Sequence, residues 1–378
     1  MKTLQACIDS LCEQARHPAR TVKAACQATG KPAVGCFPLF VPEELVYAAG
    51  FLPVGLWGGV SAFQKADQYI QSFACSIIRA NLELGMSGAY NELKAVLIPS
   101  QCDTLKCVCE NFKPAVPQVP VIGVTIPNNR TIQAAHQQLL DEFDYITEQL
   151  TALQTPDCQP MPLEEAFAVY EDYRSVMAQF RDIVPDYLNT ITPAIRHKLI
   201  KAAWFLDKKD YTAQMRELLA ALQRQPKETF QGTRCILTGI MLDAEPVLEL
   251  LQELHIAVVD DLLCHESLFP RTPTRQEGSV SSRLAQRFLD LKGASPLYDP
   301  GKPRGQMLAE LAKARGADMV FFTLMKFCDP EAFDHPFVKA DLKAAGVPLL
   351  SVEHDQLLES AGQLRTRIQG FLEINFPG

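Results

Sequence analysis

The stretch at residues 31–59, KPAVGCFPLFVPEELVYAAGFLPVGLWGG, decides the fold that we expect for this chain. Its apolar run at 33–37 predicts a strand, and a turn containing proline follows. Glu43 and Glu44 come next, in the first turn of a predicted helix, where acidic side chains interact favourably with the helix dipole. A second apolar run at 52–56 predicts another strand. This β–α–β order is typical of a doubly wound domain.

Outward from this stretch, short apolar runs alternate with amphipathic segments in two parts of the chain. The apolar runs show no alternation of polar and apolar residues, as expected for parallel sheets covered on both faces. Residues 131 to about 228 between them contain amphipathic helices and almost no strand signal. We therefore predict two flavodoxin-like, doubly wound α/β domains with parallel sheets and an additional helical region. The predicted division is a first α/β domain with N-terminal helices at 1–155, a helical connecting region at 156–230 and a second α/β domain at 231–378.

The composition excludes several classes of function. The chain has 378 residues, and its 36 Lys and Arg against 44 Asp and Glu give a net charge of −8, which argues against a nucleic-acid partner. The longest apolar runs are too short to span a bilayer, and the opening MKTLQACIDSLCEQAR predicts an amphipathic helix, unlike a signal peptide. We expect a soluble, cytoplasmic protein with no membrane partner.

Twelve cysteines are many for such a chain, and without a secretory signal we expect them to be thiols, so metal or redox chemistry outranks a disulfide framework. Most of them lie on or beside apolar stretches, where a cysteine usually acts as a small buried hydrophobe. This interpretation covers Cys7, Cys12, Cys26, Cys36, Cys158, Cys235 and Cys264.

Three cysteines occupy different positions. Cys75 opens the predicted helix CSIIRANLEL, Cys102 follows the strand KAVLIPS, and Cys328 ends the strand DMVFFTLMKFC. Ligands of doubly wound sheets bind beyond the carboxyl ends of the strands, and helix N-termini at that edge stabilise thiolates. Three thiolates do not complete a structural zinc site but suit a four-iron cluster with one iron left for an external ligand, although the usual count is four. The alternative is that CDTLKCVC is a hydrophobic helix with core cysteines.

Other polar residues carry weaker signals. Arg79 lies one turn after Cys75 and is a candidate for compensating the charge of a cluster. For the remaining features a structural role is the expectation: a helix N-cap for Asp260 and Asp261 at a strand end, surface positions for His335 and His354, and a solvated loop for the basic stretch 271–287.

Five blocks together resemble the 2-hydroxyacyl-CoA dehydratase family. The first is the opening stretch at 31–58. The others are CSIIRANLELG, LIPSQCDTLKCVCENFK, MKFCDPEAFDHPFVKADLKAAGVPLLSVEHDQ and GQLRTRIQGFLE. The CDTLK form is similar to the β subunit, the smaller or D-component of these enzymes. The resemblance runs from about residue 15 to the end of the chain.

The resemblance implies a fold, a cofactor and a reaction. Each subunit of the family has two flavodoxin-like domains and holds one [4Fe–4S] cluster on three cysteines, which match Cys75, Cys102 and Cys328 here. The family eliminates water from (R)-2-hydroxyacyl-CoA to give (E)-2-enoyl-CoA through a ketyl radical. A larger paralogous α subunit is the implied partner, and a separate ATP-dependent iron–sulfur activator injects one electron. FMN is associated with some members, and nothing in this sequence specifies a site for it.

The sequence departs from the larger subunit's pattern. Hydroxyl and carboxylate side chains near the first β–α turn help to bind substrate there, whereas CFPLF and VGLWGG here are apolar. We therefore expect the cluster of this chain to relay electrons or support the dimer. A Walker A motif is absent from the sequence, so the ATP-driven step belongs to another protein. Two alternatives stay open: a homodimeric double-cubane-type reductase and a non-catalytic electron-transfer module.

Overall fold

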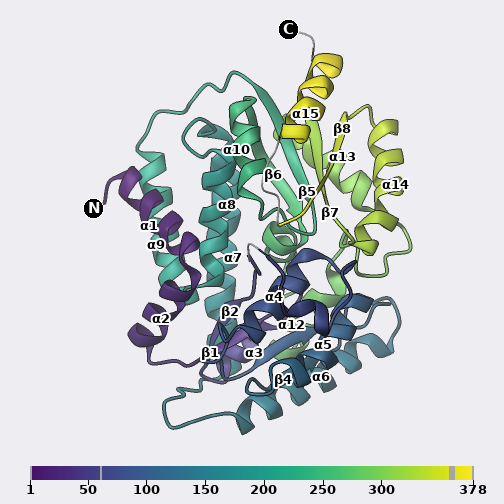
Figure 1. Ribbon diagram of the computed structural model, residues 1–378. Coiled ribbons are helices and arrows are strands. Elements are labelled where there is room, and N and C mark those ends of the chain that lie inside the picture. Colours follow the sequence, from purple (N-terminus) through teal and green to yellow (C-terminus); the bar gives the residue numbers. More distant parts are fainter. Residues whose placement is uncertain (1, 60–61, 357–361, 377–378) are drawn as a thin grey trace.

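The protein is described by a computed structural model that covers residues 2–59, 62–356 and 362–376. These residues form two four-stranded sheets with every pairing parallel, in the orders β2-β1-β3-β4 and β6-β5-β7-β8 (Figure 1). The strands are β1 (Ala33–Cys36), β2 (Leu52–Gly55), β3 (Val96–Pro99), β4 (Val121–Val124), β5 (Thr233–Gly239), β6 (Ile256–Leu263), β7 (Met319–Met325) and β8 (Leu349–His354). The prediction of two doubly wound parallel-sheet units is confirmed.

Helices cover the sheets and connect them. The first sheet carries α3 (Glu43–Ala48), α4 (Ser76–Met86), α5 (Asp103–Ala115) and α6 (Ala134–Ala152), and the chain begins with α1 (Leu4–Arg16) and α2 (Pro18–Thr29). The connecting helices are α7 (Leu163–Ile183), α8 (Pro193–Lys201) and α9 (Lys208–Gln223). The second sheet carries α10 (Glu245–Glu253), α13 (Arg304–Arg315), α14 (Asp329–Ala344) and α15 (Gly362–Asn375). Helix α11 (Phe269–Arg271) packs on α7, and α12 (Val280–Asp290) packs on α6 and α7. Short turns of helix are η1 (Ala66–Gln68), η2 (Val184–Asp186), η3 (Ala202–Trp204) and η4 (Cys264–Leu268).

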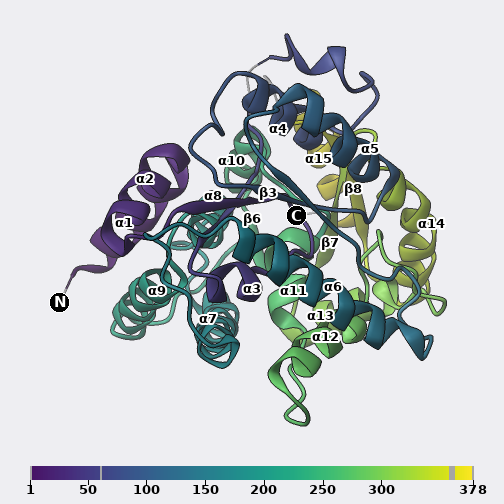
Figure 2. The same ribbon diagram turned by 90° about the horizontal axis from the view of Figure 1, so that it is seen from below.

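The connecting helices join the two sheets into one body. Helix α7 lies beside α9 and also packs on α3 (Figure 2). Apolar side chains from both sheets and from these helices share one continuous hydrophobic core, in which β1 and β3 are completely buried. Within the described residues, none of the helices is long and apolar enough to cross a membrane. The exact domain boundaries at 155 and 230 stay a prediction.

Strand β7 ends earlier than the sequence suggested. It stops at Met325, and Lys326 and Phe327 form a turn before Cys328, which precedes α14. The backbone of Phe327 has a φ of 62°, a left-handed conformation that is uncommon for a bulky residue. The turn reverses the chain so that Cys328 begins a helix and does not continue the sheet.

Three polar residues, Asp260, Asp261 and His354, were placed wrongly from sequence. Asp260 and Asp261 lie inside β6, completely buried, and do not cap a helix. Asp260 accepts from Arg315 Nε at 2.8 Å, and Asp261 is bonded to Arg196. These ion pairs hold charges in the core, which sequence patterns do not reveal because the partners are distant in the chain.

His354 is also buried, and burial lowers its pKa to about 4, so the expected surface position is wrong. His335 is half-buried beside Ser351. The stretch 271–287 is a loop only as far as Ser279, because α12 begins at Val280.

Candidate functional site

Three cysteines each precede the first turn of a helix. Cys75 is the N-cap of α4, Cys102 is the N-cap of α5, and Cys328 is the N-cap of α14. The Cys102 Sγ accepts a hydrogen bond from the backbone N–H of Leu105 at 3.4 Å, as a capping side chain does. Each thiol therefore lies at the positive end of a helix dipole, as the sequence predicted for Cys75 and Cys102.

The three thiols affect one another electrostatically, although they come from both sheets. Burial raises the pKa of Cys75 to about 12, and the charge of Cys102 adds to the effect. Burial also raises the pKa of Cys328 well above its ordinary value, with contributions from Glu331, Cys75 and Cys102. Such interactions weaken with distance, so each of these thiols lies within electrostatic range of the others.

The thiols do not form a site for a single metal ion. Within the parts of the chain that the structure describes, no three His, Cys, Asp or Glu side chains are close enough together to hold one. A four-iron cluster makes a different demand, because each cysteine binds a different iron and the sulfurs stand farther apart. Three half-buried thiols at helix N-termini have the donor chemistry that a cluster requires. Their raised pKa values mean that binding iron must displace protons. Cys75, Cys102 and Cys328 stay a predicted ligand set.

Arg79 already has partners of its own. Its Nη2 lies 2.6 Å from the Asp67 carboxylate, and its guanidinium lies over the Phe63 ring at 3.9 Å from the centroid. Its cationic charge is therefore shared with Asp67, and compensation of a cluster charge by Arg79 stays a prediction.

Residues next to the cysteines were missed in the sequence. Gln101 precedes Cys102 and is 4% exposed, yet among the described residues neither its Oε1 nor its Nε2 has a hydrogen-bond partner. By contrast, the rings of Phe73 and Phe327, close in sequence to Cys75 and Cys328, are 67% and 52% exposed. Large aromatic side chains are enriched at protein–protein interfaces.

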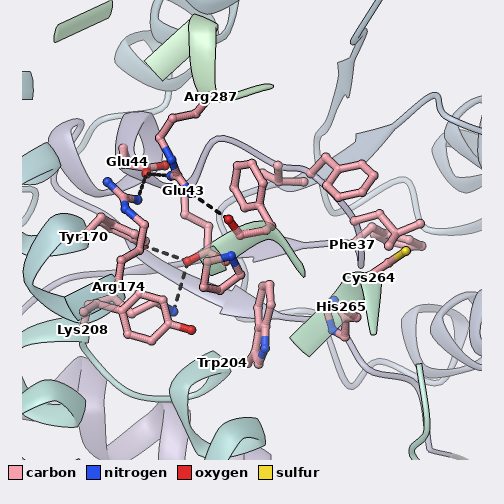
Figure 3. Close-up of a pocket in the computed structure, with 16 residues that line it drawn as sticks. Phe37, Glu43, Glu44, Tyr170, Arg174, Trp204, Lys208, Cys264, His265 and Arg287 are labelled. Carbon is pink, nitrogen blue, oxygen red and sulfur yellow. Dashed lines mark hydrogen bonds and ion pairs between the residues drawn. The ribbon is translucent and has the colours of Figure 1, made fainter. Parts of the chain in front are cut away.

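A cavity with about 590 Å³ of empty space, part of it open to solvent, opens beside the segment that joins β1 to α3. Its wall is built from both sheets' loops and from the connecting helices. Figure 3 shows the charged side chains on one side and Phe37, Cys264 and His265 on the other. The polar lining comprises Glu43, Glu44, Tyr170, Tyr173, Arg174, Lys208, His265 and Arg287.

Glu43 and Glu44 anchor the charged side of the cavity. Glu43 accepts a hydrogen bond from the Tyr170 hydroxyl at 2.8 Å and lies 3.1 Å from Lys208 Nζ. Glu44 accepts from Arg174 Nη1 at 2.7 Å. Both carboxylates stand in the first turn of α3, as predicted, and both are buried and paired with cations.

Arg287 completes this side of the cavity. Its Nη2 donates to the Phe269 carbonyl at 2.8 Å, while its Nη1 is 3.7 Å from Glu44 Oε1. Burial, reinforced by the charge of Arg174, lowers the pKa of Arg287 to about 10. The expectation of a solvated loop is wrong for this residue, which is 1% exposed on the buried face of α12.

His265 lies between two tryptophan rings. Its ring centroid is 4.2 Å from that of Trp57 and 4.4 Å from that of Trp204, on which it stacks. Burial lowers its pKa to about 3, so the imidazole is neutral at ordinary pH. The apolar stretches CFPLF and VGLWGG therefore supply aromatic walls, while the polar groups come from residues elsewhere in the chain.

The comparisons with known proteins agree with this architecture. The family model described as "2-hydroxyglutaryl-CoA dehydratase, D-component" matches residues 38–375. The chain belongs to this family. The chain is also similar to the (R)-phenyllactyl-CoA dehydratase beta subunit of Clostridium sporogenes, with 39% identity over 94% of the chain and 95% of that protein.

Two further relatives of the D-component family cover nearly the whole chain. The lactoyl-CoA dehydratase subunit beta of Anaerotignum propionicum is 36% identical over 99% of this chain and 100% of its own length. The (R)-2-hydroxyglutaryl-CoA dehydratase subunit beta of Acidaminococcus fermentans is 30% identical over 94% of this chain and 95% of its own length. This D-component is therefore a subunit of a hydro-lyase.

Proposed function

We propose that this D-component is the β subunit of an oxygen-sensitive dehydratase that converts an (R)-2-hydroxyacyl-CoA into the (E)-2-enoyl-CoA. The proposal rests on the relatives, which are named as beta subunits of dehydratases with three different substrates. One electron delivered to the substrate thioester gives a ketyl radical, from which the 2-hydroxyl leaves as hydroxide and the β-carbon then loses a proton, so that water is eliminated. The electron returns when the product forms, so the elimination is redox-neutral overall.

The observation that carries the cofactor proposal is the convergence of three thiols from two sheets. We propose that Cys75, Cys102 and Cys328 hold a [4Fe–4S] cluster. When bound, the cluster supplies one-electron transfer. The chain itself supplies three helix N-termini, those of α4, α5 and α14, whose dipoles favour a negatively charged group.

The proposed role of this subunit is electron relay. A larger α subunit would activate the substrate, and a separate ATP-hydrolysing iron–sulfur protein would supply the electron. The exposed rings of Phe73 and Phe327 beside the thiols support a protein partner at that face. A partner bound near the thiols would shorten the distance that the electron travels between this subunit's cluster and the α subunit.

The cluster is tested by anaerobic purification of the chain with its partner and by iron and sulfide analysis. We expect about four irons in this chain, and their loss in the Cys75→Ser, Cys102→Ser and Cys328→Ser variants. Cys107→Ser is the matched control, because Cys107 is an exposed cysteine on the same helix as Cys102. A folded but iron-free protein, or equal loss in the Cys107 variant, would disprove the cluster.

The relay role has a separate test. Addition of 2-hydroxyacyl-CoA to the isolated, reduced chain should leave its electron paramagnetic resonance spectrum unchanged. A substrate-dependent spectrum from this chain alone would show that it activates substrate itself.

A further inference from the structure

Two buried side chains of the cavity have polar atoms without a hydrogen-bond partner. Arg287 is 1% exposed and His265 is 3% exposed. Among the described residues, Arg287 Nη1 and both ring nitrogens of His265 have no hydrogen-bond partner. Leaving a buried polar atom unsatisfied costs about 1–3 kcal/mol, so such atoms in folded proteins usually meet water or a ligand. Both side chains line the same cavity, so one bound molecule could contact both of them.

The charges of the wall favour an anion. Three cationic side chains, Arg174, Arg287 and Lys208, face two carboxylates, Glu43 and Glu44. Lys208 pairs with Glu43, and Arg174 pairs with Glu44. Arg287 Nη1 stands 3.7 Å from Glu44, which is too far for a hydrogen bond. Among the described residues, Arg287 is therefore paired with Glu44 only by charge and has no hydrogen-bonded anion in the wall.

The opposite side favours an organic body over a bare inorganic ion. Phe37, Phe40, Trp204 and Phe269 present aromatic rings to the cavity. His265 is neutral there, so it offers one N–H donor and one nitrogen acceptor. An apolar group would contact the rings, and a carboxylate oxygen would accept a hydrogen bond from the imidazole N–H.

The backbone of the cavity wall is also held in an unusual conformation. Leu39 and Phe40 are consecutive residues with φ of 78° and 56°, where residues with side chains are uncommon. Both line the cavity. Such conformations cost about 1–3 kcal/mol and concentrate at binding sites, where the surrounding structure maintains them.

We propose that this cavity binds a small organic carboxylate, whose carboxylate group accepts a hydrogen bond from Arg287 while its apolar body contacts the aromatic side. The proposal goes beyond the dehydratase role and does not depend on the cluster, because none of the three predicted cluster cysteines lines the cavity.

The two tryptophans of the chain report on this site directly. Trp57 and Trp204 both contact the His265 ring, and Trp204 also lines the cavity. The full-length chain is titrated with butyrate and phenylacetate, with butyramide and phenylacetamide as neutral isosteres and chloride as the ionic control. We expect a saturable change in tryptophan fluorescence with the carboxylates, and binding at least about tenfold weaker for the amides, because a charge-assisted hydrogen bond is lost.

Variants assign the binding to the cavity. By isothermal titration, Arg287→Met should weaken carboxylate binding at least about tenfold, since it removes the charge-assisted hydrogen bond. Arg283→Met on the same helix should leave binding unchanged, because Arg283 does not line the cavity. His265→Phe keeps an aromatic ring between the tryptophans and should weaken binding severalfold, which provides the test if Arg287→Met does not fold. Iron content should not change in any of these variants.

No saturable response to either carboxylate would overturn the proposal. Equal affinity for acids and amides, or unchanged affinity in a folded Arg287→Met or His265→Phe protein, would overturn it as well. Neither result would bear on the iron content, so failure of this proposal is distinguishable from failure of the dehydratase role.

Discussion

Arg304 and Glu331 form an ion pair, with Nη1 and Oε1 2.8 Å apart, in which the two side chains are only 2% and 0% exposed. Arg304 stands at the start of α13 and Glu331 in the first turn of α14, three residues after Cys328. Arg304 Nη2 also donates to Thr238 Oγ1 at 2.8 Å, which fixes the guanidinium against β5. The pair therefore holds the segment that carries Cys328 against the second sheet.

Glu331→Gln should destabilise the chain by about 3 kcal/mol, because it leaves Arg304 as an incompletely compensated buried charge. Denaturant unfolding measures the change in free energy of unfolding. The control is Asp172→Asn, which breaks the half-exposed pair with Arg216 and should cost less than about 1 kcal/mol. Similar losses in the two variants would contradict the role given to burial.

Substitutions of Cys102 should separate its capping role from metal binding. In the metal-free chain, Cys102→Ala should lose about 0.5–1 kcal/mol of stability, because the N–H of Leu105 loses its acceptor. Cys102→Ser should be at least as stable as the parent, since serine is a good N-cap. Thermal unfolding checks this order. Greater stability of the alanine variant would show that the side chain does not cap α5.

The free energy of unfolding should fall at alkaline pH, because His197 loses its proton there. Burial alone would lower the pKa of His197, but the carboxylates of Glu266 and Asp243 outweigh it and raise the pKa from 6.5 to about 9. A raised folded-state pKa gives stability that is complete below pH 6.5 and is lost as the pH rises towards about 9. The parent chain should lose on the order of 2–3 kcal/mol of stability over this pH range, and the His197→Gln variant should not show this loss. Unfolding free energies across this pH range provide the measurement.

His265 should have the opposite dependence. Its pKa is lowered from 6.5 to about 3 by burial, so the unfolded chain takes up a proton below pH 6.5 that the folded chain does not. Stability is therefore lost as the pH falls, and His265→Phe should reduce that acid sensitivity without affecting the alkaline limb. If both histidine variants changed the same limb, the assignment of these two pKa values would be wrong.

Gly55 allows the close approach of Trp204 to β2. A Cβ at position 55 would lie 2.7 Å from Trp204 Cε3, a distance that requires the ring to move. Gly55→Ala should therefore cost about 1–3 kcal/mol and shift the tryptophan fluorescence as Trp204 leaves its stack with His265. Gly301→Ala is the control, because a Cβ there meets open space. An unchanged spectrum for Gly55→Ala would contradict the predicted displacement.

Local patterns predicted the elements of this fold well. Apolar runs of a few residues gave the strands, and the order of runs and amphipathic segments gave the two sheets. The positions of Cys75 and Cys102 at helix starts followed from the same pattern. These features depend on residues within one or two turns of one another, and sequence reports such relations directly.

Relations between distant residues could not be predicted. Arg287 looked like one of several basic residues in a polar stretch, but its partners, Glu44 and the Phe269 carbonyl, belong to other elements. The same applies to Asp261, whose charge is balanced by Arg196 from a connecting helix. A buried charge is tolerated only where such a partner exists, and the pairing arises when the two sheets pack together.

The three thiols belong to segments that are synthesised at very different times. Cys75 and Cys102 leave the ribosome with the first sheet, whereas Cys328 follows only after the connecting helices and most of the second sheet. A group that requires all three can therefore enter only a finished chain. Before Cys328 is made, Cys75 and Cys102 are present without it. A cell that makes this protein has to keep these two thiols reduced during that time.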